Sequence, residues 1–165
     1  MTSFNRIKIG RSTCLCLTFL CIIFGLFGCA KKENTTESIF EFHTVVTESQ
    51  EYMDAAADNI YDYWYDAIYT QEYGTSDIDL ALFYAEEANQ DYLERIEDND
   101  AVIQALYKKI KDSEYSSEIK AVVSAYTDYY ELIVNVSGSF ETYKEGKEVC
   151  KKALASALKD LAFEL

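Results

Sequence analysis

The chain has 165 residues, 49% of them hydrophobic, and it contains no proline. The hydrophobic fraction excludes a disordered chain, the length suits one domain, and the lack of proline favours long helices over a turn-rich β fold. A formal net charge of −14 argues against a basic surface that binds nucleic acid.

The N-terminal residues have the composition of a secretory signal peptide. Arg6, Lys8 and Arg11 form a basic start without acids, and an uncharged, mostly apolar stretch follows over 12–28. An uncleaved signal anchor is the alternative, and 17 residues are at the short limit for a membrane-spanning helix. Both interpretations tether the rest of the chain outside the cytoplasmic membrane.

The end of this stretch, Leu26-Phe27-Gly28-Cys29, resembles the lipobox of bacterial lipoprotein precursors. That family has Leu, a small residue, Gly or Ala, and then Cys, so that Phe27 departs from the pattern. The resemblance covers residues 1–29 only. It implies diacylglycerol on the Cys29 sulfur, cleavage after Gly28, and anchoring on the extracytoplasmic face of a bacterial membrane.

We therefore predict a signal peptide over 1–28, a lipidated Cys29 with a polar tether over 29–36, and a helical domain over 37–165. The mature chain would carry 12 Lys and Arg against 29 Asp and Glu, a net charge of −17. Only Cys29 and Cys150 would remain, so no intramolecular disulfide could form once Cys29 is lipidated.

Apolar residues recur at alternating steps of three and four over most of 37–165, which is typical of helices. We call each such series of apolar residues a seam, and the first seam runs over 39–67. A capping-box pattern, Ser38-x-x-Glu41, predicts the start of this helix, and Gly74 predicts its end. The second seam runs over 78–110, and a connection near 112–116 follows it.

The third seam runs over 119–161, and Lys147 is its one charged member. Because its phase is unbroken at Gly138 and Gly146, it favours one continuous helix over 117–163. The sequence thus predicts an all-α, elongated antiparallel three-helix bundle. The alternative is four helices with a break near Gly138.

The chemical inventory is thin. His43 is the only histidine, which excludes sites that need two, and glycine-rich phosphate loops, Gly-x-Ser-x-Gly and EF-hand patterns are absent. Cys150 lies in the third seam, where a thiol usually packs, although nearby lysines would activate it if it were exposed. Asn89 and Asn99 interrupt the second seam, where polar residues set helix register. We expect no catalytic residue, no metal site and no cofactor.

Charge is distributed unevenly. Residues 37–106 hold eighteen acids and one arginine, whereas 107–165 hold nine lysines and ten acids. In a bundle whose first and third helices run parallel, we expect one set of lysines to lie beside one set of acids: Lys144, Lys147, Lys151 and Lys152 beside Asp62, Asp66 and Glu72.

Aromatic residues are the second informative feature. The seam assignment points Tyr65, Ile68, Tyr69, Phe83 and Tyr84 outward around the first connection. Such a patch beside acids suggests a partner-binding site, and the partner would be basic. The alternatives are that the third helix covers these residues or that the packing stripe is wider than two positions in seven.

These features favour a non-enzymatic, lipid-anchored binding or spacer module of the cell envelope. The alternative is a small regulator or inhibitor of a neighbouring membrane or envelope protein. A binder should expose the aromatic patch, a spacer should not, and an enzyme would need a pocket with converging carboxylates.

Overall fold

The computed structural model describes the backbone of residues 12–165 and the side chains of residues 34–165. The helices are α1 (Ser12–Tyr65), α2 (Ile78–Ile110), α3 (Ser116–Val134) and α4 (Phe140–Glu164), and a π-helical turn, η1 (Asp66–Thr70), extends α1. Within residues 12–165 there is no strand. The all-α prediction is confirmed.

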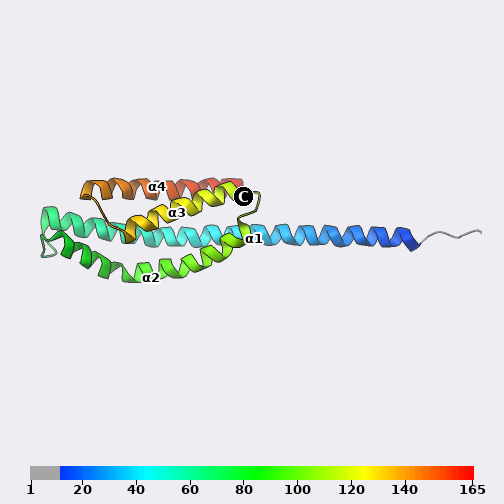
Figure 1. Ribbon diagram of the computed structural model, residues 1–165, viewed down its shortest axis with the longest axis horizontal. Helices are drawn as coiled ribbons and strands as arrows, with labels where there is room; N and C mark the ends of the chain where they lie inside the picture. The colour runs from blue at the N-terminus through cyan, green and yellow to red at the C-terminus, as the bar shows by residue number, and fades with distance from the viewer. Residues whose placement is uncertain (1–11) are drawn as a thin grey trace, which may run out of the picture.

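Successive helices run in opposite directions along one long axis (Figure 1). α1 packs against each of the other three, with α2 on one side and the α3–α4 hairpin on the other. α4 is therefore antiparallel to α1, and its N-terminus lies at the end of the bundle where α1 finishes.

The predicted continuous helix over 117–163, and with it the three-helix bundle, is wrong. The chain reverses between α3 and α4, as in the four-helix alternative. Gly138 adopts a φ of +88°, a left-handed conformation that favours glycine. Ser139 and Thr142 then form a capping box, in which the Ser139 hydroxyl accepts from the Thr142 N–H at 3.2 Å.

The unbroken phase of the third seam has a simple cause. Ile133 near the end of α3 and Phe140 at the start of α4 are seven residues apart, and both are buried. The connection therefore keeps the spacing of one heptad while it reverses the chain. Gly146 does not bend α4; a Cβ there would lie 3.2 Å from Leu132 Cδ1, because α3 and α4 approach closely at this point.

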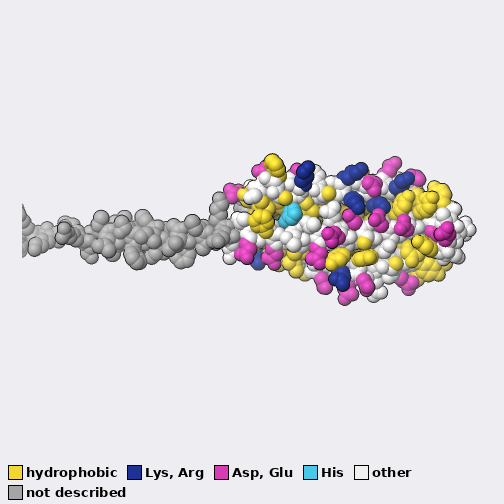
Figure 2. Space-filling model, turned by 180° about the vertical axis from the view of Figure 1, so that it is seen from behind, with side chains coloured by type: hydrophobic (Ala, Val, Ile, Leu, Met, Phe, Trp, Pro, Cys, Tyr) yellow, Lys and Arg dark blue, Asp and Glu magenta, His cyan; other side chains and the backbone are white. Residues whose placement is uncertain are grey.

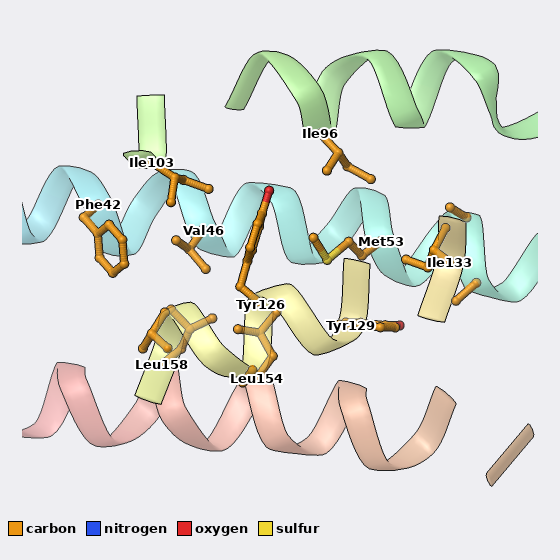
Figure 3. Packing of buried hydrophobic residues seen from close by; sticks show 14 of the residues in the cluster. Phe42, Val46, Met53, Ile96, Ile103, Tyr126, Tyr129, Ile133, Leu154 and Leu158 are labelled. Atoms are coloured by element: carbon orange, nitrogen blue, oxygen red, sulfur yellow. The ribbon is translucent and has the colours of Figure 1, made fainter. Parts of the chain in front are cut away.

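The core follows the predicted seams closely in α1. Figure 3 shows Phe42, Val46 and Met53 of α1 facing residues of α3 and α4 such as Tyr126 and Leu154. Asn89 of α2 is buried; it donates to the Ala56 carbonyl at 3.0 Å and accepts from Asn59 at 2.8 Å. Asn89 thus fixes the register of α2 on α1, which is the structural role expected of a polar seam residue.

The ends of α1 differ from the sequence pattern, whereas α2 keeps the bounds of the second predicted seam. Ser38 is an interior residue of α1, so Ser38 and Glu41 do not cap its start. At the other end Gln71, with a φ of +53°, ends the helical segment three residues before Gly74, which is also left-handed with a φ of +86°. Asp77 caps α2 by accepting from the backbone N–H groups of Asp79 and Leu80.

Candidate functional site

The end of the bundle around the first connection exposes aromatic and aliphatic side chains. The five residues predicted from the sequence are exposed by 37–58%: Tyr65, Ile68, Tyr69, Phe83 and Tyr84. Figure 2 shows hydrophobic side chains gathered at this end of the molecule, on the right of the view. Neither α3 nor α4 covers them.

Tyr65 and Tyr69 belong to an aromatic cluster between α1 and α4. Their ring centroids lie 4.8 Å apart, and each lies 6.1 Å from the ring of Phe140 at the start of α4. Phe140 is itself buried and contacts Trp64, which packs on Tyr143 at 5.8 Å. Two exposed tyrosines thus pack on buried rings. We call this cluster, formed by Tyr65 and Tyr69 with the buried Trp64, Phe140 and Tyr143 as its base, the aromatic end.

The turn after α1 is held by one carboxylate. Asp66 is buried; it accepts hydrogen bonds from the Thr70 hydroxyl and from the backbone N–H groups of Glu72 and Tyr73, the last two at 2.8 and 2.9 Å. Burial alone would raise the pKa of Asp66, but the bonds from Thr70, Tyr73 and Glu72 outweigh it and hold the pKa below its usual range. An ionised Asp66 therefore fixes the backbone next to Tyr69.

Phe83 and Tyr84 form a second group on α2, with ring centroids 6.1 Å apart. Among the described residues, no ring contact joins this pair to Tyr65 or Tyr69. The five predicted residues therefore share one end of the bundle but divide between its α1–α4 side and its α2 side.

Two lysines of α4 pair with acids of α1, but neither acid is one of those predicted. Lys147 contacts Asp58 at 2.6 Å and lies over the Tyr61 ring at 4.5 Å, and Lys151 contacts Asp54 at 3.0 Å. The expected carboxylate beside Lys147 is present. The expected set of acids is wrong, because α4 runs antiparallel to α1.

The other two lysines of the predicted set bind within their own helix. Lys144 pairs with Glu141 at 3.7 Å and Lys152 with Glu148 at 3.8 Å. Neither Asp62 nor Glu72 forms an ion pair with a described residue.

The two side chains with possible chemistry have structural contacts. His43 Nε2 lies 3.2 Å from the Leu158 carbonyl oxygen, so it joins α1 to α4. Burial and the nearby Asp128 raise the pKa of the Cys150 thiol, the opposite of activation. Among residues 34–165, no three His, Cys, Asp or Glu side chains cluster in a way that could hold a metal ion.

The predicted signal peptide over 1–28 and the lipidated Cys29 lie outside the residues whose side chains are described. Among residues 34–165, no helix has a stretch long and apolar enough to cross a membrane.

Sequence reasoning missed the base of the aromatic end. Phe140 begins α4, and a single long helix would have placed it mid-helix and far from Tyr69. The signal was present in Ser139 and Thr142, a helix-start pattern after Gly138. Comparison with protein-family models, with curated protein sequences and with solved structures finds no match to this chain.

Proposed function

We propose that this chain is a lipid-anchored, non-enzymatic binding module on the extracytoplasmic face of a bacterial membrane. The observation that carries the binding role is the exposure of Tyr65 and Tyr69 on their base of buried rings. Aromatic side chains supply much of the binding energy at protein interfaces, and a rigid base lowers the entropy lost on binding. A pure spacer would have no use for such a surface.

The position of the aromatic end supports the same role. From Asn34 to Tyr65, α1 rises about 47 Å along its axis. With a lipid on Cys29, this helix would carry the aromatic end away from the membrane surface. A partner in the cell envelope could then reach Tyr65 and Tyr69 without competition from lipid.

The binding role is tested by the double substitution Tyr65→Ala with Tyr69→Ala. Surface cross-linking in the native cell, followed by mass spectrometry, should show a partner that the wild type captures and the double variant loses. Phe163→Ala is the matched control, because Phe163 is the most exposed large hydrophobic residue within 34–165 and lies near the C-terminal end of α4. Unchanged capture by the double variant, with its helical signal retained, would reduce this protein to a spacer.

The anchoring role is tested separately at Cys29. Replacing Cys29 with Ser should abolish labelling by a radioactive fatty acid and leave the precursor uncleaved. Equal labelling of the wild type and Cys29→Ser would contradict lipidation and leave the binding role standing.

A further inference from the structure

A groove of about 480 Å³ runs between the N-terminal half of α2 and the end of α3. Leu82, Phe83 and Leu93 of α2 form one apolar wall, and Val134 and Val136 form the other. Phe83 and Val134 are exposed, so the groove opens to solvent between them, whereas Ile60, Asn89 and Ile133 are buried at its base.

The groove exists because α3 is short. α3 has 19 residues whereas α2 has 33, and the left-handed Gly138 turns the chain toward α4 soon after Val134. The first half of α2 therefore packs on α1 without a helix on its other side. Ile78 and Leu80, at the start of α2, are also exposed.

Unpaired carboxylates accompany this apolar surface. Asp79 and Glu86 line the groove, and they are seven residues apart, which places them on one side of α2 and two helical turns apart. No acid of α2 forms an ion pair with a described residue. The only arginine of α2, Arg95, lies over the Tyr52 ring at 5.6 Å. Asp79 and Glu86 are thus not neutralised by an ion pair within the described part of the chain.

From these observations we infer that the groove binds a basic amphipathic helix of a partner protein. The helix would place its apolar side chains against Leu82, Phe83 and Val134, and two Lys or Arg residues seven positions apart beside Asp79 and Glu86. This inference rests on the proposed binding function and defines the chemistry of its partner.

The shape of the groove favours a helix over a small molecule. From Asp79 to Leu93 the groove follows α2 for about 21 Å, the length of four helical turns. Small-molecule sites enclose most of the ligand surface, which an open groove does not do. Helix-in-groove recognition instead uses apolar residues at steps of three, four and seven along an open channel.

The test uses a fluorescein-labelled, stapled 15-residue helical peptide with leucines at those steps and two lysines seven positions apart. Fluorescence anisotropy with the full-length chain in a non-ionic detergent should give saturable binding, and a peptide with Glu in place of Lys should not bind. Val134→Lys should weaken binding about tenfold or more, because it places a cation in the groove. Val149→Lys, the same change at an exposed valine of α4, should leave binding unchanged.

A second pair of variants removes charge without adding any. Glu86→Gln should weaken peptide binding about two- to fivefold, as expected for the loss of an exposed ion pair. Glu87→Gln removes the neighbouring exposed acid, which does not line the groove, and should change binding less. These variants keep the inference testable if Val134→Lys fails to fold.

Several results would overturn the inference. The wild type could fail to bind the basic peptide, or Glu86→Gln and Glu87→Gln could weaken it equally. Octyltrimethylammonium, a small cation with an apolar tail, could bind to the wild type and more weakly to Glu86→Gln while the peptide does not bind. That result would make the groove a small-molecule site. Self-association abolished by Val134→Lys would make a second copy of the chain the occupant. None of these results contradicts capture through Tyr65 and Tyr69, which is measured on other variants.

Discussion

The two sides of α1 differ in whether the nearby acidic residues have ion-pair partners. On the side that meets α4, Asp54 accepts from the Tyr129 hydroxyl at 2.7 Å and pairs with Lys151, and Asp58 pairs with Lys147. On the side that meets α2, Asn59 donates to Asn89 at 2.8 Å, and no ion pair joins the two helices within the described residues. The acids of α2 face solvent without ion-pair partners among the described residues.

This difference shows why net charge alone is a poor guide to a binding surface. Lys147 and Lys151 partly neutralise the acids of α1 by intramolecular ion pairs with Asp58 and Asp54. The acids of α2 are then left as the accessible negative surface, next to an open apolar groove. A basic partner is therefore expected on the α2 side rather than beside Lys147 and Lys151.

The largest expected contrast concerns packing. Tyr143 is 1% exposed, lies against Trp64 and donates to the Ala57 carbonyl at 3.2 Å. Tyr143→Ala should lower the free energy of unfolding by about 3–5 kcal/mol, since it leaves a cavity between α1 and α4. Tyr84→Ala, on the exposed face of α2, should change it by less than about 0.5 kcal/mol. Urea unfolding followed by circular dichroism measures both, and equal losses would contradict the contrast.

The difference between buried and exposed helix faces also explains which features the sequence predicted correctly. Heptad spacing identified the core of α1, because burial against neighbours on several sides leaves a clear apolar stripe; Ile39, Phe42 and Met53 are fully buried. It also placed Tyr65 and Tyr69 outside that stripe. Spacing reports which face of a helix is apolar, and it is blind to a chain reversal that keeps the heptad phase between Ile133 and Phe140.

The features that the sequence did not predict depend on the chain reversal between α3 and α4. The direction of α4 determines which acids meet Lys147 and Lys151, so their partners could not be assigned from a single long helix. The groove beside Glu86 likewise depends on where α3 stops. Seam residues at the start of α2 already differ from the rest, since Ile78 is exposed although it keeps the heptad phase.

The second contrast concerns high pH. Burial raises the pKa values of Tyr126, Tyr129 and Tyr143, and for Tyr129 the hydrogen bond to Asp54 raises it further. A folded-state pKa above the unfolded value of about 10 gives stability that is fully present below pH 10 and is lost as pH rises. Each such tyrosine should lower the free energy of unfolding by about 1.4 kcal/mol per pH unit above pH 10.

Tyrosines on the two sides of the molecule separate this effect from general alkaline unfolding. Between pH 10 and 11.5 the free energy of unfolding should decline less steeply in Tyr129→Phe, because the contribution of one buried tyrosine is removed. Tyr84→Phe should leave this slope unchanged. The hydrogen bond from Lys151 to Asp54 raises the lysine pKa and adds a decline in the same direction. Urea midpoints measured across this pH range give the slopes, and identical slopes for the two variants would exclude a special role for Tyr129.

The smallest expected effect comes from removing a single charge, either from α4 or from α2. Lys147 is 12% exposed at its side chain, contacts Asp58 and lies over the Tyr61 ring. Lys147→Met keeps the aliphatic length but removes the cation, and should lower the free energy of unfolding by about 1 kcal/mol, because Asp58 is itself largely exposed and solvent screens the pair. Glu94→Gln on α2 removes an acid without a partner and should leave stability unchanged or raise it slightly, since neighbouring acids repel it. Raising the salt concentration should shrink both changes, because exposed charges are screened. A loss of stability in Glu94→Gln as large as that in Lys147→Met would mean that the acids of α2 stabilise the fold, and would remove the main reason for assigning them to a partner.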